Sequence, residues 1–441
     1  MDTSTLTPPS ARTVVALRVP GIDGDVSLSL KRDATTLAVH TVPSFTFDLA
    51  GRLVGGFDAG RTYRRTLDHR VIEKRGKYAE GRRERERRPL DRAEVRALCD
   101  TAYGYASAVA DGLAAGTAEV VSATTPDGAW RPWAEVALDR IARWDDARLG
   151  QDAAAFLRVY QPIGILPPDQ YRALVLQATL GCSYNRCTFC TFYRGQDFRI
   201  KLLPEFAAHI TAVKAFHGPA LASYHSIFLG EANALVAPQR LLVPMLDAVN
   251  AALAVAPPDL AGAARVRWLA EHAPAFDGIY AFVSALDALR KSPQDIAALR
   301  ARGLRRVYIG LESGDEGLLR FLAKPNTAEQ AVEAVQSIKA GGVAVGVVIM
   351  LGVGGERYAA DHVRHTVEVL NQMGLGRDDI LYFSEFVETP GSPYVEQAVE
   401  AGIAPMPVPQ MRAQRAAIQG ALRFPAAPPK LAVYDIREFA Y

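Results

Sequence analysis

Residues 174–190 read LVLQATLGCSYNRCTFC and join a short apolar run to a cluster of three cysteines. The apolar run has the composition of a buried strand. Cys182, Cys187 and Cys190 then follow within nine residues, too close together for a disulfide framework in a chain of 441 residues. Thiols clustered in this way predict a metal site in the loop that follows the strand.

The spacing C-x4-C-x2-C suits either an iron–sulfur cluster or zinc. A structural zinc site takes four ligands, whereas this segment offers three thiols and no histidine. Three protein ligands on a four-iron cluster would leave one iron open to a small molecule. Zinc and a loop without metal are the alternatives. A plant-type two-iron cluster needs a fourth, downstream cysteine, but Cys99 lies upstream and is expected to pack as a small hydrophobe.

The pattern of apolar run, loop and helix recurs after residue 165. Helical segments such as Pro293–Arg302 and Thr327–Ala340 separate the runs. The later apolar runs are Ser226–Leu229, Ile279–Val283, Val307–Leu311, Val343–Leu351 and Ile380–Phe383, with a possible terminal strand at Leu431–Tyr434. This alternation predicts an α/β fold whose parallel sheet of six units is closed or partly closed into a barrel.

Polar residues follow each of these apolar runs. After the cysteines they are Gly230-Glu231-Ala232-Asn233, Ser284, Glu312-Ser313-Gly314, the segment Gly352 to Glu356, and Ser384-Glu385. The active site of a parallel α/β fold lies at the carboxyl ends of its strands. The sequence therefore predicts that all of these groups lie together at the end of the barrel where the strands have their carboxyl ends.

Composition and net charge limit the classes of protein to which the chain can belong. Hydrophobic residues make up 49% of the chain and its net charge is +2, which is typical of a globular protein and favours neither nucleic acid nor membrane. Residues 1–10 contain no apolar signal segment, and the run Val343–Val353 is short and broken by glycines. We expect a cytoplasmic protein that does not associate with membranes.

Three regions are predicted: an N-terminal accessory domain over residues 1–164, a core over 165–395 and a C-terminal extension over 396–441. Alternating residues at Thr13–Val19 and Asp25–Leu30 predict a small sheet in the first region. Asp91 and Glu94 have the spacing of a capping box, which predicts a helix to about Gly112. Another helix is predicted between Trp130 and Tyr160.

Residues 61–96 are strongly basic, with 14 Arg or Lys against 7 Asp or Glu. The run Arg82–Arg88 mixes both signs, which is typical of a solvated, salt-bridged surface. The alternative is a phosphate-binding patch for RNA or another polyanion.

Taken with these motifs, the chain resembles the radical S-adenosylmethionine superfamily. It is most similar to the group of oxygen-independent coproporphyrinogen oxidases, elongator-like proteins and methylthiotransferases, over residues 170–395. Gly181–Gly195 carries the most specific part of the likeness, although the usual family spacing is C-x3-C-x2-C. The resemblance implies a partial (β/α)6 TIM-like barrel with an N-terminal α+β accessory domain. It also implies that Cys182, Cys187 and Cys190 hold a 4Fe-4S cluster.

The resemblance further implies which residues bind S-adenosylmethionine, each by its position in the family's motifs. These are Gly230 and Glu231 for the amino group, Glu312 and Ser313 for the ribose, Gly352 and Glu356 for the glycine-rich element beside adenine, Lys324 for the carboxylate, Phe189 near the adenine, and Ser284 after the third strand. It identifies no residue that acts on the substrate.

The implied activity is reductive cleavage of S-adenosylmethionine to a 5′-deoxyadenosyl radical, which abstracts hydrogen from a substrate. Only Cys99 remains for any second cluster, so the electron is expected from an external donor of the flavodoxin or ferredoxin type. The substrate could be a small molecule, a peptide or RNA. The alternative function is a non-catalytic iron–sulfur or zinc protein that senses redox state or binds nucleic acid. His362 and His365 could hold a second metal. The alternative, which is commoner for histidines, is that they are solvated or packed in the core.

Overall fold

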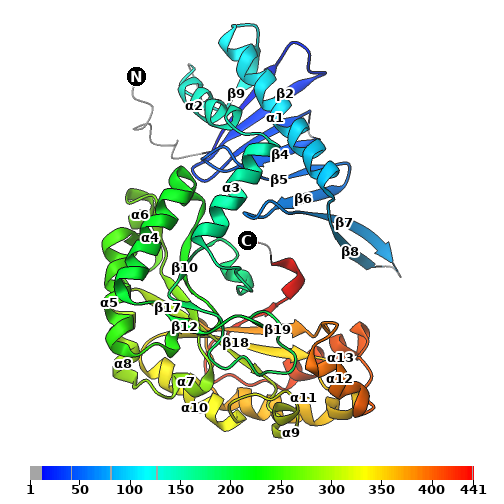
Figure 1. Cartoon of the computed structure of the whole chain (residues 1–441), viewed down its shortest axis with the longest axis vertical. Helices are drawn as coiled ribbons and strands as arrows, with labels where there is room; N and C mark the ends of the chain where they lie inside the picture. Colours follow the sequence, from blue (N-terminus) through cyan, green and yellow to red (C-terminus); the bar gives the residue numbers. More distant parts are fainter. Residues whose placement is uncertain (1–11, 41, 80–81, 126–127, 440) are drawn as a thin grey trace. The chain divides into compact units, whose positions relative to one another are not determined.

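The computed structural model describes residues 12–40, 42–79, 82–125, 128–439 and 441, with side chains omitted over 77–85. The chain divides into two compact units (Figure 1). Unit 1 comprises the residues up to Gln161, Ala212–Tyr224 and Tyr441; unit 2 comprises Pro162–Thr211 and His225–Phe439. Within the described ranges, no helix is both long and apolar enough to cross a bilayer.

Unit 1 is built on an antiparallel sheet of nine strands in its described part, ordered β8-β7-β6-β5-β4-β3-β2-β1-β9. Its strands are β1 (Thr13–Arg18), β2 (Asp25–Leu30), β3 (Thr35–Val39), β4 (Ser44–Phe47), β5 (Leu53–Asp58), β6 (Arg61–Arg65), β7 (Val71–Ala79), β8 (Arg82–Pro89) and β9 (Glu119–Ala123). Buried and part-exposed residues alternate along β1 and β3, as expected when a sheet packs on one face. The two strands predicted within residues 13–30 are confirmed as β1 and β2.

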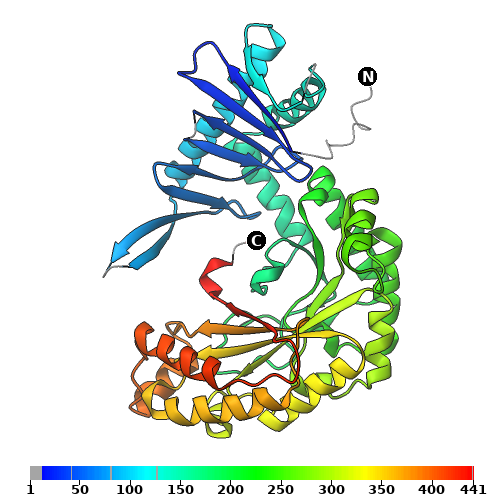
Figure 2. The same ribbon diagram turned by 180° about the vertical axis from the view of Figure 1, so that it is seen from behind.

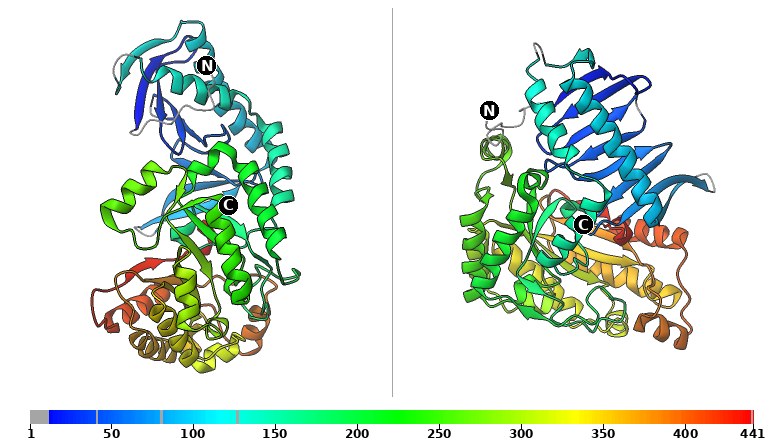
Figure 3. Two further views of the ribbon diagram at one scale, coloured as in Figure 1. Left: turned by 90° about the vertical axis from the view of Figure 1, so that its left-hand side faces the viewer. Right: turned by 45° about the horizontal axis from the view of Figure 1, so that its top comes forward.

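Three helices pack on that buried face: α1 (Arg92–Ala114), α2 (Arg131–Ala142) and α3 (Asp146–Val159). Figure 3 shows α1 lying along the sheet. The capping box predicted for Asp91 and Glu94 is present at the start of α1. The single helix predicted between Trp130 and Tyr160 is wrong. Two helices form because the Asp145 side chain accepts from the N–H of Arg148 and starts α3 anew.

The basic segment 61–96 forms strands β6 to β8, so many of its charged residues lie on regular strands. Directly opposite residues on β7 and β8 include Glu73 with Arg88 and Arg75 with Glu86, so opposite charges face each other. Arg88 also bonds both carboxylate oxygens of Glu94 at 2.7 Å. The contacts of the described residues therefore fit the prediction of a solvated, salt-bridged surface. The side chains of Arg82 and Arg83 lie outside the described ones.

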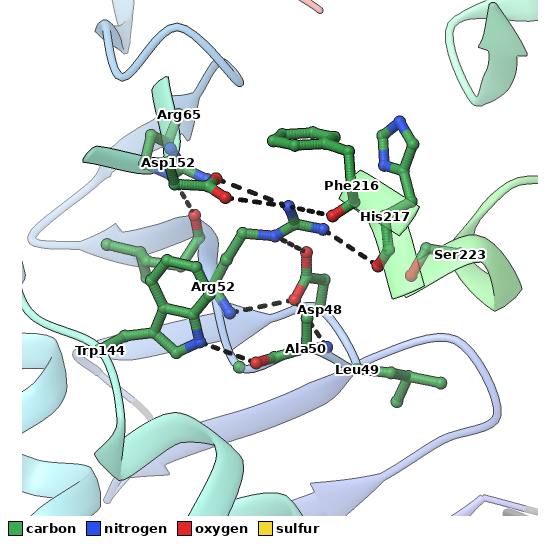
Figure 4. Close-up of polar contacts among 12 residues, drawn as sticks. Asp48, Leu49, Ala50, Arg52, Arg65, Trp144, Asp152, Phe216, His217 and Ser223 are labelled. Carbon is green, nitrogen blue, oxygen red and sulfur yellow. Dashed lines mark hydrogen bonds and ion pairs between the residues drawn. The ribbon is translucent and has the colours of Figure 1, made fainter. Parts of the chain in front are cut away.

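A buried ion cluster joins the β4–β5 turn to the end of helix α4 (Leu203–His217) within unit 1 (Figure 4). Arg52 is 1% exposed, and its Nε donates to Asp48 Oδ2 at 2.7 Å. Its other nitrogens lie 3.5 Å from Asp152 and from the carbonyls of Phe216 and His217. Burial opposes the charge of Arg52, but the two carboxylates outweigh it and raise the pKa of Arg52. Arg52 therefore holds the helix end through charge and hydrogen bonds together.

Unit 2 is a parallel α/β domain with seven strands in its described part, ordered β10-β13-β16-β17-β18-β19-β20. The strands are β10 (Ala173–Gln177), β13 (Ser226–Gly230), β16 (Ile279–Phe282), β17 (Leu304–Glu312), β18 (Ala344–Leu351), β19 (Ile380–Glu385) and β20 (Lys430–Val433). The α/β class and the six predicted parallel strands are confirmed, and the predicted terminal strand is the seventh. No pairing joins β10 to β20 in the described chain, so the barrel is partial.

Helices follow the strands and form the outer layer of unit 2 (Figure 2). They are α5 (Gln239–Ala252), α6 (Gly262–Glu271), α7 (Ala285–Ala288), α8 (Pro293–Arg300), α9 (Glu316–Phe321), α10 (Ala328–Ala340), α11 (Gly355–Gln372), α12 (Pro393–Glu400) and α13 (Val408–Ala421), besides the first part of α4. Short pairs β11 (Thr179–Leu180) with β12 (Arg199–Ile200) and β14 (Ala254–Val255) with β15 (Ala275–Phe276) complete the unit. Every residue of β10 and β13 is buried, as in parallel sheets covered on both faces.

Replacing Arg52 with methionine should destabilise unit 1 by ~3–5 kcal/mol, because Asp48 and the helix carbonyls would be left buried without their partner. Urea unfolding followed by tryptophan fluorescence measures this, since Trp130, Trp133 and Trp144 all lie in unit 1. Arg18→Met is the matched control: Arg18 is 58% exposed, and its pairs with Asp25 and Glu119 should contribute less than about 1 kcal/mol. Equal effects of the two substitutions would contradict a stabilising role for the buried cluster.

Candidate functional site

A cavity of about 250 Å³ opens at the carboxyl ends of the unit 2 strands. Its wall includes residues from the loops after β10, β13, β16, β17 and β19. All three clustered thiols line it, together with Phe189, Ser284, Glu312 and Lys324 from the predicted cofactor-binding set. Lining residues outside that set include Asn233, Tyr308, Glu385, Phe386 and Tyr434.

The cysteine loop is held in shape by its own polar groups. The N–H of Asn185 donates to Cys182 Sγ at 3.3 Å, and the Asn185 side chain donates to the Tyr193 carbonyl at 2.8 Å. Asn185 has a φ of 49°, a left-handed conformation that asparagine tolerates. Arg194 donates to the carbonyls of Cys187 and Cys190. The cysteine loop has one residue more than the usual C-x3-C-x2-C spacing. It nevertheless forms a defined turn that places its thiols at the cavity.

Two of the three thiols, those of Cys187 and Cys190, are largely removed from water. Burial raises the pKa of Cys187, and it raises the pKa of Cys190 to about 11. The positive charge of Lys324 acts in the opposite direction on Cys187. Metal coordination deprotonates a thiol outright, so a bound metal would overcome this penalty. Within the described chain, no three His, Cys, Asp or Glu side chains gather closely enough to hold a single metal ion.

Glu312 and Lys324 form an ion pair beside the thiols. Lys324 Nζ donates to the Gly310 carbonyl at 2.8 Å and lies 3.3 Å from Glu312 Oε1. Burial disfavours the charge of Lys324, but Glu312 and the neighbouring thiols outweigh it and raise the pKa of Lys324. Glu312 has a φ of 63°, a strained conformation that costs ~1–3 kcal/mol for a non-glycine residue. Strain of this kind is common where a side chain must point at a ligand.

Asn233 lines the cavity and links three loops, and it was not among the residues predicted to bind the cofactor. Its Nδ2 donates to Ser183 Oγ at 2.9 Å, next to the first cysteine, and to Asp287 Oδ2 at 2.6 Å. Its Oδ1 accepts from the N–H of Ser284 at 3.1 Å. The sequence signal for Asn233 was its position directly after β13. Glu231 shares this position, so the sequence does not show which of the two side chains reaches the cavity.

Glu231 does not line the cavity. It is 4% exposed, its carboxylate accepts from the Gln177 side chain, and its backbone N–H donates to Thr179 Oγ1 at 3.1 Å. Burial raises the pKa of Glu231 to about 7, although hydrogen bonds from Gln177 and Tyr193 act against the shift. The neighbouring Gly230 closes β13 without reaching the cavity wall either.

Three further predicted residues lie away from the cavity wall. Ser313 is fully buried, and its Oγ lies 2.8 Å from His362 Nδ1. The N–H of Gly352 donates to Gln414 Oε1 at 2.8 Å. Glu356 is exposed in the first turn of α11 and accepts from a surface glutamine. Their roles in binding the cofactor remain predictions.

His362 and His365 bond to different residues. His362 faces Ser313, whereas His365 Nδ1 lies 2.7 Å from Asp315 Oδ2. Burial lowers the pKa of His362 to about 4, so this imidazole is neutral near pH 7. These contacts fit the prediction that His362 packs in the core, and they do not support a metal site shared by His362 and His365.

Comparison with known proteins identifies the domain. Residues 176–369, somewhat under half of the chain, match the family model described as "Radical SAM superfamily". The chain therefore carries a radical SAM domain. Proteins of this superfamily use a 4Fe-4S cluster and S-adenosylmethionine, and in general they need an external electron donor. No curated protein matches the chain.

Several solved structures are similar to the chain. The cobalamin-dependent radical enzyme OxsB with S-adenosylmethionine bound has 13% identity and a TM-score of 0.34, covering 56% of this chain and 31% of that one. The methyltransferase TsrM from Kitasatospora setae with a 4Fe-4S cluster has 18% identity and a TM-score of 0.38, covering 56% and 45%. Coproporphyrinogen III oxidase from Escherichia coli has 14% identity and a TM-score of 0.37, covering 60% and 54%. The chain thus spans from a third to about half of these proteins.

The buried carboxyl of Glu231 should make stability depend on pH. Its folded pKa of about 7 lies above the unfolded value near 4.5, so the stabilisation is complete below the lower value and is lost as pH rises through 7. The free energy of unfolding should fall by ~3 kcal/mol over that window, and Glu231→Gln should remove this part of the decline. Urea unfolding without added S-adenosylmethionine, at about pH 5 and about pH 8, measures it. A decline of the same size in both proteins would show that Glu231 ionises normally.

Proposed function

We propose that this protein is a radical S-adenosylmethionine enzyme whose 4Fe-4S cluster is held by Cys182, Cys187 and Cys190. The supporting observation is that all three thiols line one cavity together with a buried ion pair and aromatic side chains. The donor set fits a cluster with three protein ligands: Cys99, the fourth cysteine, is fully buried in the core of unit 1. When bound, the cluster and S-adenosylmethionine supply a carbon-centred radical that abstracts hydrogen from the substrate.

The chain's own residues would bind and orient the cofactor. Glu312 presents a carboxylate suited to ribose hydroxyls, and Lys324 presents an ammonium suited to a carboxylate. Lys324 also holds Glu312 in place through their 3.3 Å contact. Asn233 and Ser284 fix the loops after β13 and β16 relative to the cysteine loop. The aromatic ring of Phe189 lines the cavity and offers a surface for the adenine.

The electron would come from an external donor of the flavodoxin or ferredoxin type, since only Cys99 remains and one cysteine is too few for another cluster of the same kind. A cytoplasmic location fits this proposal because reducing compartments keep thiols free for metal binding. The alternative, a non-catalytic iron–sulfur or zinc protein, would hold metal without cleaving S-adenosylmethionine.

Replacing Cys182, Cys187 or Cys190 singly with alanine should abolish the 4Fe-4S signal and the formation of 5′-deoxyadenosine, because each thiolate is a ligand. Iron and sulfide content, electron paramagnetic resonance of the reduced protein and product analysis after reduction measure this. Cys99→Ala is the control and should retain the cluster. Wild-type protein that binds iron but makes no 5′-deoxyadenosine would support the non-catalytic alternative.

Glu312→Gln should raise the Kd for S-adenosylmethionine about tenfold, because it weakens a charged hydrogen bond of ~1.5–3 kcal/mol. Isothermal titration of the anaerobic, cluster-loaded protein gives the Kd. Glu368→Gln is the control, since Glu368 is exposed on α11 and does not line the cavity, so its replacement should leave the Kd unchanged. Equal effects of the two substitutions would contradict a contact between Glu312 and the cofactor.

A further inference from the structure

Glu385 places a carboxylate at the cavity that the proposed cofactor site does not use. It ends β19, next to β18 and β20 in the sheet, whereas the thiols, Ser284 and Glu312 follow β10, β16 and β17. Among the described residues, the cavity wall contains three acidic or basic side chains, Glu312, Lys324 and Glu385. Lys324 pairs with Glu312 at 3.3 Å, so its charge does not neutralise Glu385.

The nearest cation to Glu385 is a poor partner. Arg437 lies 4.0 Å away, at the limit of an ion pair, and does not line the cavity. The Arg437 guanidinium already binds both oxygens of Asp435, at 2.8 and 3.0 Å. The side chain of Glu385 is 27% exposed, so it is partly removed from water. A partly desolvated carboxylate with a distant counter-ion favours binding of a cation.

The wall of the same cavity also carries apolar and aromatic side chains. Phe386 follows Glu385 in sequence, and Phe282, Tyr308, Tyr434 and Ile436 also line the cavity. Tyr308 and Tyr434 direct their hydroxyls to Asp169 and to the Leu166 carbonyl, so these groups are already satisfied. Tyr308 and Tyr434 are 0% and 3% exposed, whereas Phe282, Phe386 and Ile436 keep part of their surface accessible. These three side chains can pack against an apolar body, and ring faces also attract a nearby cation.

We propose that the substrate of this enzyme is an apolar or aromatic molecule that carries a protonated amine, and that Glu385 binds this amine. The inference rests on the proposed function, because it assigns the remaining wall of the same cavity to the substrate. The aromatic rings bind the body of the molecule, and the carboxylate fixes its orientation towards the thiol side. Glu385 is thus a specificity-determining residue that contacts substrate.

Two probes with the same ring and opposite charge test the proposal: tryptamine and indole-3-propionate. Each is titrated by calorimetry into the anaerobic, cluster-loaded protein saturated with S-adenosylmethionine. The wild-type protein should bind tryptamine about tenfold more tightly, equivalent to ~1.4 kcal/mol. Glu385→Gln should remove this preference, and Glu385→Asp should keep part of it. Glu388→Gln is the control, since Glu388 lies three positions away and does not line the cavity.

Several results would overturn the inference: no binding of tryptamine, equal binding of the two probes, or a preference that survives in Glu385→Gln. Weaker binding of S-adenosylmethionine to Glu385→Gln, with the amine preference unchanged, would assign Glu385 to the cofactor instead. Melting temperatures of the variants establish that they fold, and the aspartate variant gives a second readout. Formation of 5′-deoxyadenosine is assayed separately, so failure of the proposed function is distinguished from failure of the charge preference.

Discussion

Parallel pairing of the unit 2 strands is the constraint on which the candidate site depends. The seven described strands of the main sheet, β10, β13, β16, β17, β18, β19 and β20, run in one direction, so the loops at their carboxyl ends leave from the same edge of the sheet. Thiols from the first loop and Glu385 from the sixth therefore line one cavity. Every residue of β10 and β13 is buried, and burial of this kind specifies the register in which strands pair.

Buried charge within the cavity is arranged in two ways. The Glu312 carboxylate is neutralised internally by Lys324, which is also fixed by the Gly310 carbonyl. Among the described residues, the cation that the Glu385 carboxylate meets is Arg437 at 4.0 Å, so its charge is available to a ligand. Uncharged groups, above all Asn233, hold the loops that carry these charges. A site whose polar groups are already oriented does not have to reorganise them when a ligand binds.

Unit 1 reaches stability by other means. Its sheet packs on α1 to α3, and its outer strands β6 to β8 are rich in charged residues, with opposite charges facing each other at Glu73 with Arg88 and at Arg75 with Glu86. The buried Arg52 joins the β4–β5 turn to the carbonyl end of α4, where a cation also meets the negative end of the helix dipole. Neither feature depends on long apolar runs, which is why this unit carries a weaker signal in its sequence.

The sequence alone was sufficient for the α/β class, the six core strands and the thiol cluster, because these rest on local patterns of apolar runs and residue spacing. It also predicted that Phe189, Ser284, Glu312 and Lys324 belong with the thiols, and the structure brings them together. It did not predict strands β6 to β8, where charge alternates instead of hydrophobicity, nor the division of one helix at Asp145. The sequence predicted that Glu231, Asn233 and Glu385 lie together at the carboxyl ends of the strands, and only the tertiary structure decided that Glu231 turns into the core while the other two line the cavity. The physical reason is that strand formation depends on nearby residues, whereas the direction of a loop side chain depends on partners such as Gln177 and Asp287, which lie far away in sequence.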